Sequence, residues 1–286
     1  MTVNGTGTQF TATGAGTSVV VGDAGSGSLA IVNGATATIG SLSVGNTGNG
    51  FLTVSALSTL HAGTLAVGVG GMGYASNSGT VTASALYIVQ QQTGTGAFAN
   101  SGTMAVSNGY IGYTGTGGFT AASGAAKFTT LSVGTQNSAS GTVTVGAGSV
   151  NADYATFGDA GKGWLNIYMN TFASSALTLG AQATGVGTVS LNYYGGSYLT
   201  TSTLVVGGAG AGHFNLTAGI VTVGSSMYVG YAAGGSGTVT IGGGGVFSAN
   251  NVYLGYSGSG KLLINGGTAT LGNLSVGSGA NGSGAI

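Results

Sequence analysis

Few residues in this chain have side chains that could do chemistry, and they are widely spaced. Of 286 residues, three are Lys or Arg, three are Asp or Glu, two are His and none is Cys. A Ser–His–Asp site needs an acid beside its base, and sugar-cleaving sites need paired carboxylates. Neither histidine has an acid in its own repeat unit or in the unit that follows it, so we expect no catalytic residues. The charged and imidazole side chains on which this conclusion rests are those of Asp23, His61, Lys127, Asp153, Asp159, Lys162, His213 and Lys261.

The acids are also placed unfavourably for a metal. Calcium-binding repeats place Asp regularly in glycine-rich turns, but the turn Gly207–Gly212 contains none. Asp23 and Asp159 hold equivalent places about six repeat units apart. We therefore predict no metal site and no cofactor. Asp159 shares a loop with Lys162, which predicts one surface ion pair of little energetic weight.

The composition excludes several classes of protein. Charged residues make up 2% of the chain, against about a quarter of an average protein, and the net charge is zero. Nucleic acid binding depends on Lys and Arg, so no nucleic acid partner is expected. No apolar run approaches the roughly 18 residues of a membrane span, and no signal peptide is visible. A surface without charge repulsion favours self-association.

The elements that must position these residues form an internal repeat. An apolar residue, any residue, an apolar residue and glycine recur along the chain, and Val89 once replaces the glycine. The interval averages about 23 residues, from 255 residues over 11 intervals by direct count. A regular period of this size is typical of a solenoid. The marker glycines are Gly22, Gly45, Gly68, Gly112, Gly134, Gly158, Gly180, Gly207, Gly230, Gly255 and Gly277.

Apolar residues within each unit alternate with a period of two. Pairs such as Leu42 and Val44, or Val239 and Ile241, indicate strands with one face inward. Three short strands per unit cannot bury their own apolar face, but stacked units can. The sequence therefore predicts an all-β, single-stranded parallel β-solenoid, a right-handed β-helix of about 12 coils forming one domain over residues 1–286. A two-sheet sandwich would have no reason for this period.

Aromatic side chains occupy outward positions of the predicted strands. Tyr228 and Tyr253 fill equivalent positions in neighbouring units, and Tyr231 and Tyr256 both follow a marker glycine, which predicts two stacked ladders. Stacking that stabilises parallel coils accounts for such a pattern. The alternative is an aromatic contact surface for a glycan or a partner protein. Another outward column contains Phe51, Trp164, His213 and Lys261, and Tyr87 is a further outward tyrosine.

Threonine pairs raise a further alternative, ice binding. Thr-x-Thr occurs at residues 11–13, 36–38 and 268–270. A flat array of such pairs would favour ice binding, but we expect these pairs not to lie in consecutive coils. Thr is also simply a favoured strand residue.

Several units resemble a known bacterial repeat. They are similar to the repeat shared by type V secretion (autotransporter) passengers and PEP-CTERM-associated surface proteins. The resemblance covers nearly the whole chain and is weakest at 69–105 and 190–203. It implies a secreted or surface-displayed bacterial β-solenoid, and the family has no catalytic residues to transfer. The segments that carry it best are 204–219, 227–231, 235–244 and 252–267.

The chain begins and ends inside the same strand of the repeat. Ile286 occupies the place of Leu262, and residues 2–4 match residues 263–265. Either this is an excerpt of a longer repeat protein, or copies stack head to tail through a non-closing contact, which makes filaments. With Met1 retained, the join slips by one residue, and such a slip turns side chains to the opposite face. The junction strand would consist of Ala285, Ile286, Thr2, Val3 and Asn4.

These observations together predict a structural protein rather than an enzyme. We expect an extracellular or bacterial cell-surface solenoid that stacks head to tail into a fibre or serves as a surface stalk. Its main partner would be further copies of itself. The competing class is an adhesin whose outward aromatic residues, Tyr228, Tyr231, Tyr253, Tyr256 and Trp164, contact an extracellular glycan or matrix.

Overall fold

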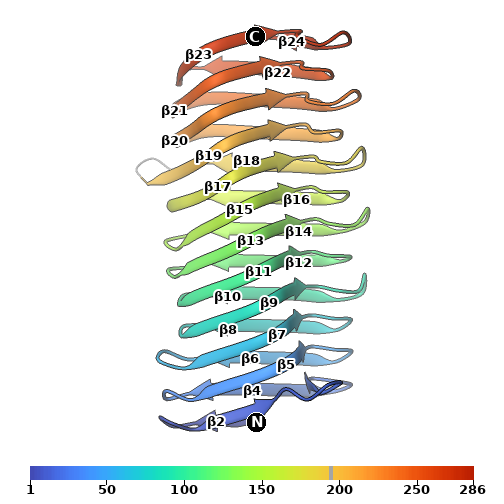
Figure 1. The fold of residues 1–286 in the computed structure, drawn as a ribbon, viewed down its shortest axis with the longest axis vertical. Helices are drawn as coiled ribbons and strands as arrows, with labels where there is room; N and C mark the ends of the chain where they lie inside the picture. Colours follow the sequence, from blue (N-terminus) through green and yellow to red (C-terminus); the bar gives the residue numbers. More distant parts are fainter. Residues whose placement is uncertain (193–195) are drawn as a thin grey trace.

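The computed structural model describes residues 1–192 and 196–286, and every regular element in these ranges is a β-strand. The chain winds as a stack of coils from the N-terminus at the bottom to the C-terminus at the top (Figure 1). Each strand pairs in parallel with the equivalent strand of the neighbouring coil, so that Ser26 pairs with Asn49 and Asn49 with Met72. The predicted parallel β-solenoid of about 12 coils, each of about 23 residues, is confirmed.

Most coils contribute one short and one long strand. The short strands are β4 (Ser26–Val32), β6 (Asn49–Val54), β8 (Met72–Asn77), β10 (Thr95–Asn100), β12 (Thr116–Ala121), β14 (Ser140–Val145), β16 (Lys162–Ile167), β18 (Val186–Leu191) and β22 (Ser259–Asn265). The long strands are β5 (Thr36–Val44), β7 (Thr59–Val67), β9 (Thr80–Ile88), β11 (Thr103–Ile111), β13 (Ala125–Val133), β15 (Ser149–Phe157), β17 (Asn170–Leu179), β19 (Ser197–Val206) and β23 (Thr268–Val276).

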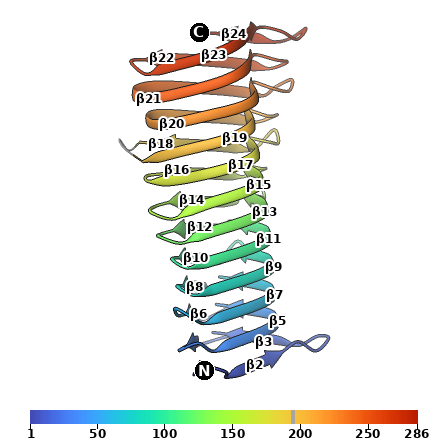
Figure 2. The same ribbon diagram turned by 60° about the vertical axis from the view of Figure 1, so that its left-hand side comes forward.

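The remaining strands lie in the end coils and in two continuous coils. They are β1 (Thr2–Asn4), β2 (Gln9–Ala12), β3 (Ser18–Val21) and β24 (Ser283–Ala285), together with β20 (Ala211–Val229) and β21 (Ser236–Leu254), in which the short and long strands run together. Seen from a second direction, the coils remain evenly stacked (Figure 2). No helix in the described residues is long and apolar enough to cross a membrane.

The expectation of three separate strands per unit is wrong for most coils. The third run of one unit and the first run of the next form one long strand, as β5 shows by pairing with both β2 and β3. Ala37 and Ile39 are buried, and so are Leu42 and Val44, so the inward alternation shifts by one residue at the middle of the strand. That shift bends the strand around the core while both halves keep their apolar side chains inside.

The marker glycines form the predicted corner after each long strand. All of them have positive φ, from 63° to 77°, a region that favours glycine. A Cβ at Gly158 would lie 2.2 Å from the backbone carbonyl of Val186 in the next coil, so the position also lacks space for a side chain. Val89, which replaces the glycine once, adopts the same conformation, with φ of 66°.

A second glycine column, which we did not predict, packs against the first. The second residue of each short strand is glycine, and a Cβ at Gly163 would lie 2.2 Å from the backbone nitrogen of Gly158. Because both columns lack side chains, the backbone at each corner packs directly against the backbone of the following short strand and of the next coil. The signal was present in the sequence, because this glycine follows the marker position by five or seven residues in every unit.

The loops between the two glycine columns alternate in length from Gly68 onward. Short and long loops follow each other coil by coil, and the long ones project further at the right-hand edge (Figure 1). The Thr184 hydroxyl donates to the side-chain oxygen of Asn137, 2.5 Å away and two coils back. The long loops that contain Asn137 and Thr184 therefore contact each other across the short loop between them.

The core consists of apolar columns along the axis, interrupted in the described residues by a few polar side chains, among them the pair Asn77 and Asn100 and the buried Thr201. Phe98, Phe119 and Phe128 are fully buried, with tilted or edge-to-face rings. Asn77 and Asn100 replace aliphatic residues in one inward column, where the Asn77 amide donates to the Asn100 side-chain oxygen over 2.7 Å. The Asn100 amide in turn donates to backbone carbonyls, so this buried pair is satisfied.

Candidate functional site

Four of the predicted tyrosines form one exposed aromatic cluster at the corner of two neighbouring coils. Tyr228 stacks on Tyr253 with ring centroids 5.0 Å apart, and Tyr231 stacks on Tyr256 at 5.4 Å. The two predicted ladders also meet edge to face, with Tyr228 and Tyr231 centroids 5.2 Å apart. Tyr231 and Tyr256 are the more exposed members. We call these four residues the upper tyrosine cluster.

A second aromatic cluster lies on the same columns nearer the N-terminus. Tyr87 stacks on Tyr110 with centroids 4.9 Å apart, and Tyr113 packs edge-on against both. Burial raises the pKa of the Tyr87 phenol above its ordinary value of 10.0, and the neighbouring Tyr110 and Tyr113 raise this pKa further. We predicted only that Tyr87 points outward. The sequence pattern that could have predicted Tyr110 and Tyr113 is Tyr-x-Gly-Tyr at residues 110–113. The same pattern recurs in the upper tyrosine cluster.

Trp164 lies on a different strand from the tyrosine clusters. It is in β16, where it pairs with Thr142 on one side and Thr188 on the other. The register places Phe51, Trp164, His213 and Lys261 in one column of the short strands, but small or polar residues separate them. Phe51 has one aromatic neighbour in this column, Tyr74, which sequence reasoning did not identify.

The titratable residues are dispersed over the structure. The Nδ1 atom of His61 lies 2.7 Å from the Thr82 hydroxyl. The predicted Asp159–Lys162 pairing is replaced by a contact between coils, in which the Gln182 amide donates to Asp159 over 3.0 Å. In the described residues, no group of three or more His, Asp or Glu side chains is arranged to hold a metal.

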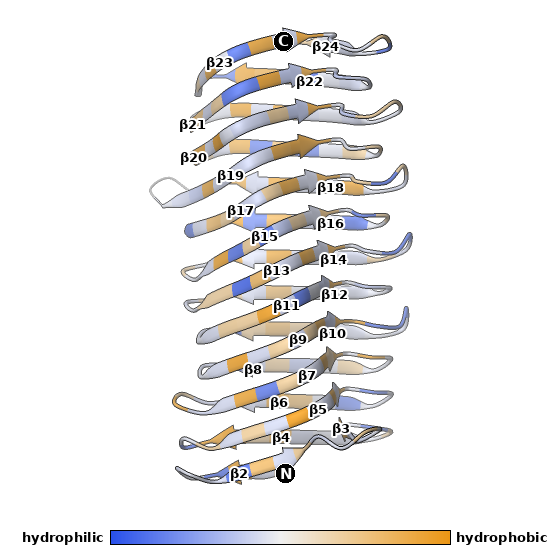
Figure 3. Cartoon of the chain, in the orientation of Figure 1, coloured by the Kyte–Doolittle hydropathy of each residue, from blue (hydrophilic) through white to orange (hydrophobic). Residues whose placement is uncertain are grey.

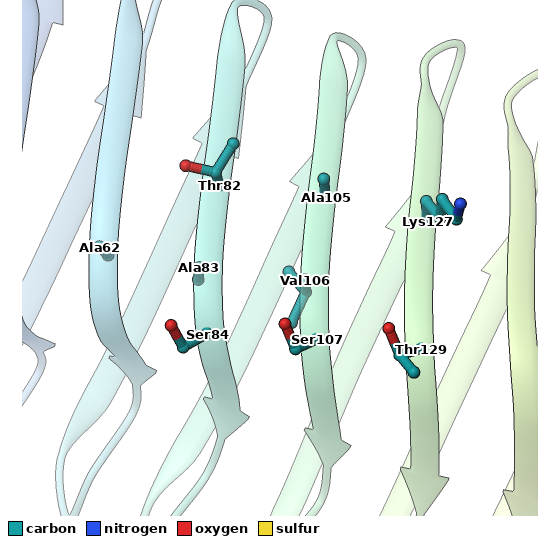
Figure 4. A pocket seen from close by; sticks show the side chains of 9 residues that line it. All are labelled: Ala62, Thr82, Ala83, Ser84, Ala105, Val106, Ser107, Lys127 and Thr129. Atoms are coloured by element: carbon teal, nitrogen blue, oxygen red, sulfur yellow. The ribbon is translucent and has the colours of Figure 1, made fainter.

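A shallow trough crosses the bends of the long strands β7, β9, β11 and β13. The hydroxyls of Ser84, Ser107 and Thr129 follow one another along it, and Lys127 adds one ammonium group (Figure 4). The inward residues Ala62 and Ala83 form part of its floor, and the cavity volume is about 410 Å³. Hydroxyls and one cation can hold a polyol or an anion by hydrogen bonds.

A second trough lies on the short strands β8, β10, β12 and β14. Its volume is about 460 Å³, and no charged side chain lines it. Met72 and Tyr74 stand at one end, Ala97 and Gly118 form the floor, and Thr142 stands at the other end. We call this cavity the short-strand trough.

The threonine pairs do not build an ice-binding array. Contrary to expectation, two pairs lie in consecutive coils, because Thr11 pairs with Thr38. Thr36 faces Gln9 instead of a threonine, and the next partner of Thr38 is His61. The register therefore offsets these two pairs and leaves one contact between them. Thr36 instead begins a column one threonine wide, which continues through Thr59, Thr80 and Thr103.

The two end coils expose strand edges and part of the core. Among the described residues, β1 pairs only with β4, and β24 only with β22. Leu274 continues the buried column of Val252, yet it is 41% exposed because no coil covers it. Apolar side chains at this end are therefore open to solvent.

Searches of protein-family models, curated proteins and solved structures found no match to this chain. The resemblance to autotransporter-type repeats therefore stays a prediction from the sequence pattern. The surface features of the chain that could bind a partner are the two aromatic clusters, the two troughs described above and the open end coils.

Proposed function

We propose that this chain is a rigid structural rod, displayed outside a bacterial cell, that stacks head to tail or serves as a stalk. The observation that carries the proposal is the parallel pairing of successive coils from β1 to β24, which makes one continuous sheet along the described chain. Unpaired parallel edges template further strands. At about 4.8 Å per coil, twelve coils span about 58 Å along the axis.

In the proposed head-to-tail form, the register of β1 and β24 defines how two copies would join. Thr2 pairs with Ala30, which puts Met1 opposite Leu29, and Ala285 pairs with Lys261, which puts Ile286 opposite Leu262. Leu29 and Leu262 belong to one column of the repeat, so Met1 and Ile286 claim the same position. A copy without Met1 would continue the strand from Ile286 into Thr2 without a slip.

Electron microscopy of the purified chain, prepared without Met1, tests this proposal. We expect unbranched rods of uniform width, much longer than the about 58 Å of one chain. Leu274→Lys should shorten them to single particles, because a charge at the open end opposes stacking. Ile220→Lys is the matched control, since Ile220 is 43% exposed on a side face, and it should leave the rods intact. Single particles from the chain that lacks only Met1 would refute stacking.

An adhesive surface is a second candidate, supported by the exposure of the upper tyrosine cluster. Tyr231 and Tyr256 present ring surface to solvent, and amphipathic aromatic rings are common contact residues. If the cluster is adhesive, replacing both residues with Ser abolishes attachment of the chain to a glycan-coated surface. If the rings only stabilise the coils, attachment is unchanged and only the midpoint of urea unfolding falls.

A further inference from the structure

Gly118 is a glycine that the backbone does not require. Its φ lies outside the positive range, and a Cβ built there would meet no atom within 4 Å. Gly118 lies inside β12, whereas other glycines with as much space, such as Gly7 and Gly234, lie in loops. Glycine inside a strand weakens it, and it often marks a place where a ligand approaches closely. The fold therefore leaves the absence of a side chain at this position unexplained.

The absent side chain opens the floor of the short-strand trough. Gly118 pairs with Ala97 on one side and with Thr142 on the other, and Ala97 pairs with Tyr74. Small residues therefore occupy two successive places in a column that carries Phe51 and Tyr74 below and Trp164 above. The column dips between aromatic side chains, and the dip is open along the axis.

The size of the trough selects a small or chain-like ligand. Its volume of about 460 Å³ falls in the range of small-molecule sites, roughly 300–1,000 Å³. A stable protein partner would need about 800 Å² of surface on each side, far more than this trough offers. Beyond Thr142 the same column continues to Trp164, so a linear molecule bound in the trough can extend along the strand surface.

The lining selects an uncharged, amphipathic ligand. Tyr74 is 43% exposed and presents an aromatic face beside the exposed Met72. Thr95, Thr116 and Thr142 supply hydroxyls that both donate and accept hydrogen bonds. No ammonium, imidazole or carboxylate group lines the cavity to bind a charged ligand. An apolar ring face combined with hydroxyl groups is the chemistry of a neutral sugar.

We propose that the short-strand trough binds a segment of an uncharged polysaccharide. One sugar ring stacks on Tyr74, the chain crosses the space above Ala97 and Gly118, and the threonine hydroxyls bond to sugar hydroxyls. The site is separate from both tyrosine clusters and does not depend on head-to-tail stacking. A structural rod with this site would be held to a neutral glycan along its side.

A substitution that fills the trough tests the proposal without disturbing a packing contact of the fold. Gly118→Ile places a strand-forming side chain where there is space for it, so the urea midpoint should stay the same or rise. The probes are neutral hexasaccharides of glucose and of N-acetylglucosamine, followed by calorimetry, with oligogalacturonate as the charged comparison. We expect at least tenfold weaker binding of the best neutral probe by Gly118→Ile and by Tyr74→Ala.

Thr238→Ile is the matched control, because Thr238 occupies the same column five coils away, and it should leave sugar binding unchanged. Three results would overturn the proposal: no neutral probe binds the unaltered chain, the charged probe binds as tightly, or Gly118→Ile leaves affinity unchanged. Rod length, measured on the same variants, should not alter, so failure of the sugar site is distinguishable from failure of stacking.

Discussion

Single glycines serve different purposes in this chain, and the structure separates them. At Gly158 both the positive φ and the adjacent carbonyl of the next coil exclude a side chain. At Gly234, in a loop, φ is 83° but a Cβ would meet nothing within 4 Å. At Gly118 neither constraint applies, which is why we assign that glycine to ligand binding rather than to the fold.

Alanine substitution should separate the two structural constraints. Gly234→Ala adds only the strain of a non-glycine residue at positive φ, about 1 kcal/mol. Gly158→Ala adds a clash with Val186 as well, so we expect a loss of at least about 3 kcal/mol. Urea unfolding followed by circular dichroism measures both. Equal losses for the two variants would show that coil-to-coil contact at the corner is looser than described.

Tyr87 should make stability depend on alkaline pH. Its folded pKa is raised above 10.0 by burial and by Tyr110 and Tyr113, so the folded chain holds the phenol proton more tightly than the unfolded chain. The stabilisation is fully present below pH 10 and is lost as the pH rises through the folded pKa. Tyr87→Phe should weaken this loss, as measured by the urea midpoint at a series of pH values. An identical pH profile for both proteins would contradict the assignment.

Among the elements, the loops carry a period of two coils that the strands do not have. Long loops recur at about 9.6 Å along the axis, twice the strand spacing, and Thr184 bridges two of them through Asn137. The strands keep one register on either side of each loop, whatever its length. Loop length is therefore independent of the core.

Shortening one long loop should be tolerated. Deleting Ala183 and Thr184 reduces the step from Gly180 to Gly187 to the five residues found in neighbouring coils. We expect the rod to survive with a loss of about 1 kcal/mol, since the Thr184 hydroxyl, which contacts both the Asn137 side chain and the Ala160 carbonyl, is removed. Deleting Leu165 and Asn166 from β16 is the control. It should unfold the chain because it removes a fully buried side chain and shortens β16 relative to its partners β14 and β18. Differential scanning calorimetry distinguishes the outcomes.

The strands and corners were predictable from sequence because they depend on local rules repeated many times. Alternation at Leu42 and Val44 and the glycine after each such pair appear in nearly every unit. The bend inside the long strands was not predictable, because it depends on how two apolar runs close around one core. Asn77 and Asn100 were missed because each breaks the apolar pattern, and their hydrogen bonds to each other and to nearby backbone groups depend on the folded coils.

The candidate sites were predictable where the register repeats and not where it leaves a gap. The upper tyrosine cluster follows from identical positions in neighbouring units, and the Tyr110–Tyr113 motif follows the same rule. The short-strand trough arises where side chains are small or absent, at Ala97 and Gly118. In a chain with 63 glycines, one glycine without a backbone role does not stand out until the space around it is known.

At the scale of the molecule, the chain is a column of core enclosed by strands that carry very few charged residues. Most of the ribbon is pale or orange in hydropathy, and strongly hydrophilic segments are isolated (Figure 3). The sides are closed by backbone pairing, whereas the end coils expose edges and side chains such as Leu274 and Val276. Burying these ends against another copy would remove apolar surface from water and extend the same sheet.

Cryo-electron microscopy of the assembled chain, prepared without Met1, tests the proposal of head-to-tail stacking most directly. We predict a continuous solenoid in which the spacing of about 4.8 Å between coils passes through each junction without a break. Ile286 of one copy should lie next to Thr2 of the following copy, in the column of Leu262. Particles that remain single rods, or copies that join side by side, would contradict the proposal.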